Sequence, residues 1–243
     1  MDAIRSMNAE LAILPESQQK REKEFKEAGV DSFFVQPKRE SLDVVKETIN
    51  KIGLLVGDSE RADLLNNTFD GIVKDVIDKT AKVSADKRIV FMGQEKNQVV
   101  ATEMTQNNII EQAKGVNAVV EYDKQKDDVS FEAGQYAEVE MSTLAQINPD
   151  IIIVPNYAKF KIDDILAAPE LAGTKAVQNK QVYMFPSLLE PWDYSTLSCC
   201  LGICWTANLL HPNEFSRTDM LTDVDKFYTT LYNKKFSAEK LGI

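Results

Sequence analysis

The chain has 243 residues, of which 44% are hydrophobic, with a mean hydropathy of −0.28 and a formal net charge of −10. This acidic balance disfavours nucleic acids and anionic membrane surfaces as partners, because phosphate binding needs a local excess of lysine and arginine. No apolar run approaches the roughly 18 residues of a membrane span, and the first residues lack the pattern of a signal peptide. We therefore expect a globular protein that is either cytoplasmic or has an export segment outside this sequence.

Two segments far apart in the chain carry the same pattern. MNAELAILPES (7–17) and INPDIIIVPNY (147–157) each place an Asn and an acid before an aliphatic run that closes with Pro. Each is followed by polar helical sequence, a glycine (Gly29 or Gly173) and a second apolar run ending in Pro, DSFFVQP or KQVYMFP. This shared order of strand, helix, glycine and strand predicts an internal duplication.

The first copy predicts a strand at 11–14, a helix at 18–28 and a strand at 33–35, the β-α-β alternation of a parallel sheet. Apolar residues then recur at helical spacing over 41–56. Gly57 ends this helix, and Asp58 or Ser59 caps the next. The second helix, 59–83, should be about 35 Å long at about 1.5 Å per residue, which suggests a connecting strut.

The second unit begins with a strand at 88–93, a polar loop at 94–98 and a helix that Gly115 ends. A strand over NAVVE (117–121), a loop to Glu140, a helix at 141–146, and strands at 151–154 and 180–186 follow. The last third is helical, and His211 before Pro212 ends its first helix. We expect a partial N-terminal lobe at 1–58, a connecting helix at 59–84, and a C-terminal lobe at 85–243 whose last helices can pack back toward the first lobe.

A strand–helix–strand block at 87–121 precedes the repeated element in the second unit and has no counterpart in the first. An open parallel sheet without its first strands would expose unpaired edges. We therefore expect either that the first lobe is truncated or that a neighbour covers its edge.

Motifs for catalysis and nucleotide binding are missing from the sequence. His211 is the only histidine, and no nucleophile–His–acid set can be assembled, so we predict no catalytic residue. Cys200 and Cys204 share a helical face, but no histidine and no cysteine beyond Cys199 is near them, which favours a buried face of small residues over a metal site. No glycine pattern of the dinucleotide or P-loop type occurs.

A loop with the sequence EPWDY (190–194) leaves the carboxyl end of a predicted strand, where open α/β sheets bind ligands. Together, EMTQNNIIEQAKGVNAV (103–119), EMSTLAQINPDIIIVP (140–155) and EPWDYSTLSCCLGICWTANLLHPNEF (190–215) resemble the substrate-binding proteins of ABC importers for iron–siderophore complexes, haem and corrinoids. The resemblance covers nearly the whole chain but not the family's first strands, signal peptide and lipid-attachment cysteine. It implies an α/β fold with two Rossmann-like lobes, each with a parallel-rich sheet, joined by one long rigid helix.

The resemblance also implies ligand contacts on three loops at the cleft. Lys96 could meet an anionic chelate, although a solvated loop lysine is the simpler alternative. The other open alternatives are a surface aromatic for Tyr136 and a plug at the edge of the lobe for Trp192. The implied contacts are Gln94, Lys96, Tyr136, Trp192, Asp193 and Tyr194.

The family docks to its permease through an acid near the tip of each lobe, which pairs with permease arginines. The matching positions are Asp2 in the first copy and Ser142 in the second, where Glu140, two residues earlier, is a substitute acid. All three positions also suit helix starts, where such side chains accept from free backbone N–H groups, so capping alone is an alternative.

The resemblance thus implies a solute-binding protein that captures a chelated metal compound and hands it to an ABC permease and its ATPase. It implies a periplasmic or membrane-anchored extracytoplasmic location, no enzymatic activity, no cofactor and no resident metal. Two rivals remain open. A metallocluster- or cofactor-handling protein of nitrogenase-like architecture would need cysteines on loops that face the cleft, and a truncated paralogue would bind no ligand.

Overall fold

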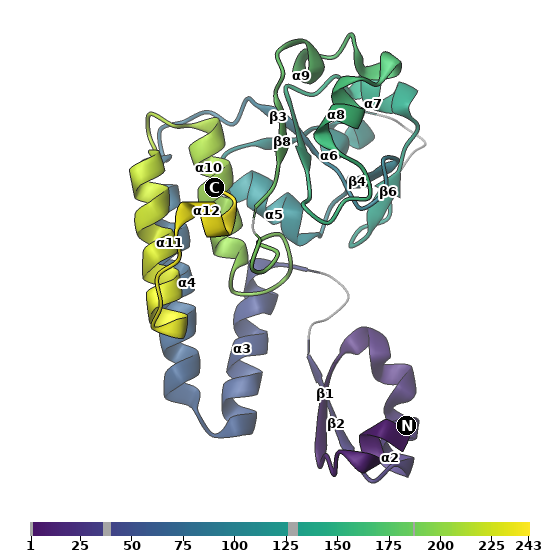
Figure 1. Ribbon diagram of the computed structural model, residues 1–243, viewed down its shortest axis with the longest axis vertical. Helices are drawn as coiled ribbons and strands as arrows, with labels where there is room; N and C mark the ends of the chain where they lie inside the picture. The colour runs from purple at the N-terminus through teal and green to yellow at the C-terminus, as the bar shows by residue number, and fades with distance from the viewer. Residues whose placement is uncertain (1, 36–39, 126–130, 187) are drawn as a thin grey trace.

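The computed structural model describes residues 2–35, 40–125, 131–186 and 188–243. It has three parts: a small N-terminal unit that stands apart, a bundle of long helices, and a unit built on a larger sheet (Figure 1). No helix in these ranges is long and apolar enough to cross a membrane.

The N-terminal unit is a parallel pair of strands covered by short helices. Strands β1 and β2 pair in parallel, with Leu11 opposite Asp31. Phe25, Val30 and Val35 are buried hydrophobic residues of this unit. The predicted strand–helix–strand order is therefore confirmed, with the helical part divided between a 3-10 helix and an α-helix. The elements are α1 (Asp2–Ser6), β1 (Leu11–Pro15), η1 (Glu16–Arg21), α2 (Glu22–Glu27) and β2 (Asp31–Val35).

Two long antiparallel helices follow, α3 (Leu42–Val56) and α4 (Ser59–Lys79). Gly57 ends α3 with a left-handed φ of 74°, and the Asp58 side chain caps α4 by accepting from the backbone N–H of Arg61 at 3.0 Å. Both signals were predicted and are confirmed. The 21 residues of α4 span about 30 Å, slightly less than expected because the helix ends at Lys79.

A four-stranded sheet in the order β5-β3-β7-β8, parallel throughout, forms the centre of the third part. Successive side chains of a strand point to opposite faces, and the buried residues divide accordingly. Ile89 and Ile153 join the core made with helix α5 and with helix α10 (Cys199–Leu210), whereas Val90 and Ile152 join the core beneath α6 to α9. The strands and the helices between them are β3 (Arg88–Phe91), α5 (Thr105–Gln112), β5 (Val116–Asn117), α6 (Ala118–Lys124), α7 (Met141–Ile147), β7 (Ile151–Val154), α8 (Ile162–Leu166), η2 (Pro169–Leu171), α9 (Lys175–Gln178) and β8 (Val182–Met184).

Two predictions in this unit are wrong. NAVVE does not continue as a strand, because the Asn117 side chain accepts from the backbone N–H groups of Val119 and Val120 and so starts helix α6. The region predicted as loops around 98 and up to Glu140 contains an antiparallel pair, β4 (Gln98–Val100) and β6 (Tyr136–Glu138). Each of these strands has three residues and a partner distant in sequence, which gives a periodicity search little to detect.

The C-terminal helices pack on the long helix α4. Helix α10 (Cys199–Leu210) lies between α4 and α5, and α11 (Arg217–Tyr232) runs beside α4 (Figure 1). The Arg61 guanidinium of α4 donates to the backbone oxygen of Leu231 at 2.8 Å. Helix α12 (Ala238–Leu241) closes the chain. The α/β class with parallel-rich sheets and a long connecting helix is confirmed.

The repeated segments also share backbone detail. Asn8 follows α1 with a φ of 50°, and Asn148 follows α7 with a φ of 49°. Each asparagine is followed by a strand that ends at or beside a proline and pairs in parallel with the next strand of its unit. The duplication expected from sequence therefore extends to the left-handed residue between helix and strand.

Candidate functional site

A cavity of about 540 Å³ opens at the carboxyl ends of β3, β7 and β8. This is the edge at which open α/β sheets bind ligands. The lining comes from the sheet unit, from the segment between β8 and α10, and from Glu40, two residues before α3, and none of residues 2–35 contributes. The lining residues are Glu40, Gln94, Met104, Gln106, Gly134, Tyr136, Tyr157, Asp193, Tyr194, Ser195 and Thr196.

Each polar side chain is placed by the end of an element. Tyr157 follows β7, Asp193 follows β8, and Gln106 belongs to the first turn of α5. Tyr136 begins β6, whose pairing with β4 brings the ring over the sheet edge. Gly93 makes room for it, because a Cβ there would lie 3.0 Å from the Tyr136 ring and 2.6 Å from the Cβ of Gln98.

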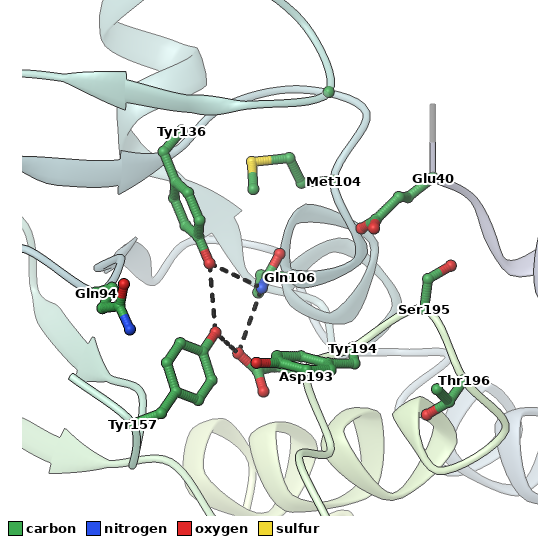
Figure 2. Close-up of a pocket in the computed structure, with 11 residues that line it drawn as sticks. Glu40, Gln94, Met104, Gln106, Tyr136, Tyr157, Asp193, Tyr194, Ser195 and Thr196 are labelled. Carbon is green, nitrogen blue, oxygen red and sulfur yellow. Dashed lines mark hydrogen bonds between the residues drawn. The ribbon is translucent and has the colours of Figure 1, made fainter. Parts of the chain in front are cut away.

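Four of these side chains form one hydrogen-bonded network (Figure 2). The Tyr157 hydroxyl donates to Oδ2 of Asp193 at 2.6 Å, and the two phenol oxygens of Tyr136 and Tyr157 lie 3.3 Å apart. Nε2 of Gln106 donates to the same Asp193 oxygen at 3.3 Å and to the Tyr136 oxygen at 3.4 Å. A carboxylate that accepts two hydrogen bonds is held firmly in place.

Burial sets the protonation of this network. Asp193 is only 2% exposed, and burial raises the pKa of its carboxyl, while hydrogen bonds from Tyr157 and Gln106 oppose that rise. Burial also raises the pKa of Tyr136 to about 12. The pKa of Tyr157 rises through burial and through the adjacent Asp193 charge. Both phenols therefore keep their protons at neutral pH.

Glu40 supplies a second carboxylate from the opposite side of the cavity (Figure 2). Its Oε2 accepts from the backbone N–H and the hydroxyl of Thr105, at 2.9 and 2.7 Å. Its own backbone N–H donates to the oxygen of Glu103. An acid at a helix N-terminus is favoured by the free N–H groups and the helix dipole, so α5 fixes the position of Glu40.

The structure brings four of the six expected contact residues to the cavity: Gln94, Tyr136, Asp193 and Tyr194. Trp192 is fully buried, and its indole N–H donates to the Tyr228 hydroxyl at 3.0 Å. Trp192 and Asp193 lie in a turn between β8 and α10, and there Trp192 packs against α11 whereas Asp193 lines the cavity. The tryptophan is thus part of the protein interior and does not line the cavity.

Lys96 also lies away from the cavity. It borders a separate surface hollow of about 400 Å³ with Glu140, and its Nζ is 3.9 Å from the Asp164 carboxylate. Glu140 and Ser142 are exposed at the start of α7. The Glu140 side chain makes no capping hydrogen bond to that helix. Asp2 is the first residue of α1.

Sequence reasoning missed Tyr157, Gln106 and Glu40. A signal existed for Tyr157, because it stands directly after the aliphatic run of a predicted strand, where ligand-facing residues are expected. Gln106 lies in the helix segment used for the resemblance. Glu40 carries no local signal, since only the tertiary contact with Thr105 brings it to the cavity.

The described ranges contain no group of three or more His, Cys, Asp or Glu side chains that could hold an ion. The three cysteines are buried in α10, and burial raises the pKa of each thiol. The nitrogenase-like alternative would require cysteines that face the cavity, and none of the three lines it.

A family model described as periplasmic binding protein matches residues 7–189. The chain belongs to that family. Among curated proteins, the molybdate-binding protein MolA of Haemophilus influenzae is 24% identical over 105 residues, which cover 43% of this chain. This sequence match spans only 30% of MolA.

Solved structures of periplasmic binding proteins share the fold over nearly the whole chain. A periplasmic solute-binding protein from Veillonella parvula superposes with a TM-score of 0.79 at 22% identity, covering 98% of this chain and 70% of its own. MolA bound to molybdate superposes with a TM-score of 0.81 at 16% identity, covering 97% of this chain and 76% of its own. Helicobacter pylori CeuE in complex with nickel and histidine superposes with a TM-score of 0.74 at 20% identity, covering 96% of this chain and 72% of its own.

Proposed function

We propose that this family member is the solute-binding component of an ABC importer and that it captures a small metal-containing compound in the cavity beside Tyr157 and Asp193. One observation carries the proposal: a buried polar network lines an open cavity at the carboxyl edge of the sheet, in a chain of the periplasmic binding protein family. A concave site with a few converging polar groups is the usual form of a small-molecule site. No bond needs to be made or broken there.

A metal-containing ligand is supported by the similar structures, two of which are named for molybdate and for nickel with histidine. Within that class we propose a chelated metal, of the iron–siderophore, haem or corrinoid type. Tyr194 is 47% exposed and meets Tyr157 edge-to-face at 5.5 Å, so the two rings offer flat apolar area beside the polar network. Aromatic rings of this kind suit an organic chelate.

Calorimetric titration of the full chain with a ferric siderophore, haem, cobalamin, nickel–histidine and molybdate tests the proposal. We expect one of these compounds to bind at micromolar concentration or below, and Tyr157→Phe to weaken that binding at least tenfold. The matched control is Tyr183→Phe, which removes a hydroxyl that donates to Gln181 outside the cavity. A folded protein that binds none of the five compounds would contradict the proposal.

We also propose that the protein delivers its ligand to a permease and its ATPase from the outer side of the membrane, as a free or anchored extracytoplasmic protein. The docking acids would be Glu140, beside Ser142, on one unit and Asp2 on the other. Exposure of Glu140 without a capping bond supports this role. In a reconstituted importer, Glu140→Lys should reduce the ATPase stimulation caused by the protein, whereas the exposed, distant Glu239→Lys should not. Equal effects of the two substitutions would remove the support for a specific docking acid.

A further inference from the structure

The hydrogen atoms of the cavity network are all used inside the network. The only hydroxyl hydrogen of Tyr157 goes to Asp193, so in the contact between the two phenols Tyr136 must be the donor. The two hydrogens of the Gln106 amide go to Tyr136 and Asp193. The reverse amide orientation would set its oxygen against the Asp193 carboxylate and is therefore disfavoured.

Within these four side chains, acceptor groups are what remains for a ligand. Oε1 of Gln106 is buried, in a side chain that is only 4% exposed, and has no hydrogen-bond partner among the described residues. A buried acceptor without a partner is unfavourable, and here it belongs to a residue that lines the cavity. The network therefore receives hydrogen bonds from a ligand more readily than it donates them.

The charge of the lining points the same way. Glu40 and Asp193 are both carboxylates, and the described lining residues include no lysine, arginine or histidine. Lys96, the one cation expected at this site, lies beside Asp164 in the separate hollow. An oxyanion such as molybdate carries negative charge and accepts hydrogen bonds, so it meets like charge at Glu40 and Asp193 and no free donor in the network of Tyr136, Tyr157, Gln106 and Asp193.

Resting on the proposed function, we infer that the cavity selects a positively charged metal complex whose outer ligands carry N–H or O–H donors, and that it rejects free oxyanions. The donors of the complex would reach Gln106 Oε1 and the two carboxylates. This ligand class is opposite in charge to the molybdate bound by MolA, with which the chain shares its fold.

Hexaamminecobalt(III) is a suitable probe, because it is cationic, presents only N–H donors and does not exchange its ligands. Calorimetry at low salt compares it with nickel–histidine, molybdate and an anionic ferric tricatecholate. We expect the wild-type chain to bind hexaamminecobalt(III) at least tenfold more tightly than either anion. Asp193→Asn and Glu40→Gln should each weaken this binding at least tenfold, and Asp193→Asn should strengthen molybdate binding because the new amide donates.

Asp164→Asn is the matched control, since it changes the net charge equally on a side chain outside the cavity. Thermal melts establish that each variant is folded, and Glu40→Gln carries the test if Asp193→Asn does not fold. Cation binding that both cavity variants leave unchanged would overturn the inference, as it would reflect only the acidic surface. Tighter binding of either anion would overturn the inference and support the proposed function. No binding of any compound in either titration panel would overturn both.

Discussion

Asp223 lies on α11 and is only 5% exposed, between α4 and α10. Burial is the main cause that raises the pKa of its carboxyl from 3.8 to about 6, with a further rise from Asp75 that Lys226 and Lys79 oppose. When folding raises the pKa of an acid, the folded state is destabilised at every pH at which that acid is ionised. The unfolded chain loses this proton near pH 4, so the free energy of unfolding falls as the pH rises to about 6 and stays lower above it. A pKa difference of about two corresponds to roughly 3 kcal/mol.

Asp223→Asn removes this cost and keeps the shape of the side chain. We expect the variant to be more stable than wild type by about 1–3 kcal/mol at pH 8, the lower end allowing for a buried amide, and equally stable near pH 4. Urea denaturation followed by circular dichroism between pH 4 and 8 measures the difference. A difference that does not change with pH, or a variant less stable at pH 8, would refute the reasoning.

Asp219, one turn earlier, is the matched control because its pKa moves the other way. Hydrogen bonds from Lys79 and Ser216 lower the pKa of Asp219 to about 2. Its stabilising contribution is present above about pH 4 and is lost as the pH falls toward 2. Asp219→Asn should therefore destabilise the protein throughout the range from pH 4 to 8, and the size of this destabilisation should change little with pH in that range.

Three further predictions concern packing and capping. Gly202→Ala should lower the melting temperature by several degrees, because its Cβ would lie 2.5 Å from the backbone oxygen of Trp192. By contrast, a Cβ at Gly71 would meet only the end of a lysine side chain. Gly71→Ala should therefore stabilise the protein by about 0.5–1 kcal/mol in urea denaturation. Asn117→Ala should cost about 1–2 kcal/mol in the same assay, since it removes the cap of α6. The three buried cysteines should react with a thiol reagent only after unfolding; rapid labelling of the native protein would contradict their burial.

Local sequence signals were sufficient for the elements whose stabilising contacts are themselves local. The turn at Gly57 and Asp58 needs only a left-handed residue and a capping side chain, and both are visible in the sequence. The aliphatic runs of β1 and β7, each closed by a proline, identified the strands and the duplication. The strand predicted at 180–186, which is β8, also located the carboxyl edge at which the cavity opens, because the loop EPWDY follows it.

The two wrong predictions arose where short-range capping or long-range pairing decides the structure. At Asn117 a buried side chain caps the next helix, which overrides the β preference of the valines that follow. The pair β4–β6 depends on contacts between residues nearly forty positions apart, and that pair carries Tyr136. Neither strand is long enough to show an alternating pattern of its own.

Sequence patterns were enough to predict the α/β class, the repeated unit, the long helix and the loop that carries Asp193, because periodicity, caps and turn residues act over a few positions. Which side chains meet, by contrast, depends on how distant segments pack together. The tertiary structure turned Trp192 inward to Tyr228 and Asp193 outward to Tyr157, and it brought Glu40 to the N-terminus of α5. Such choices depend on packing between distant segments, which no local pattern encodes.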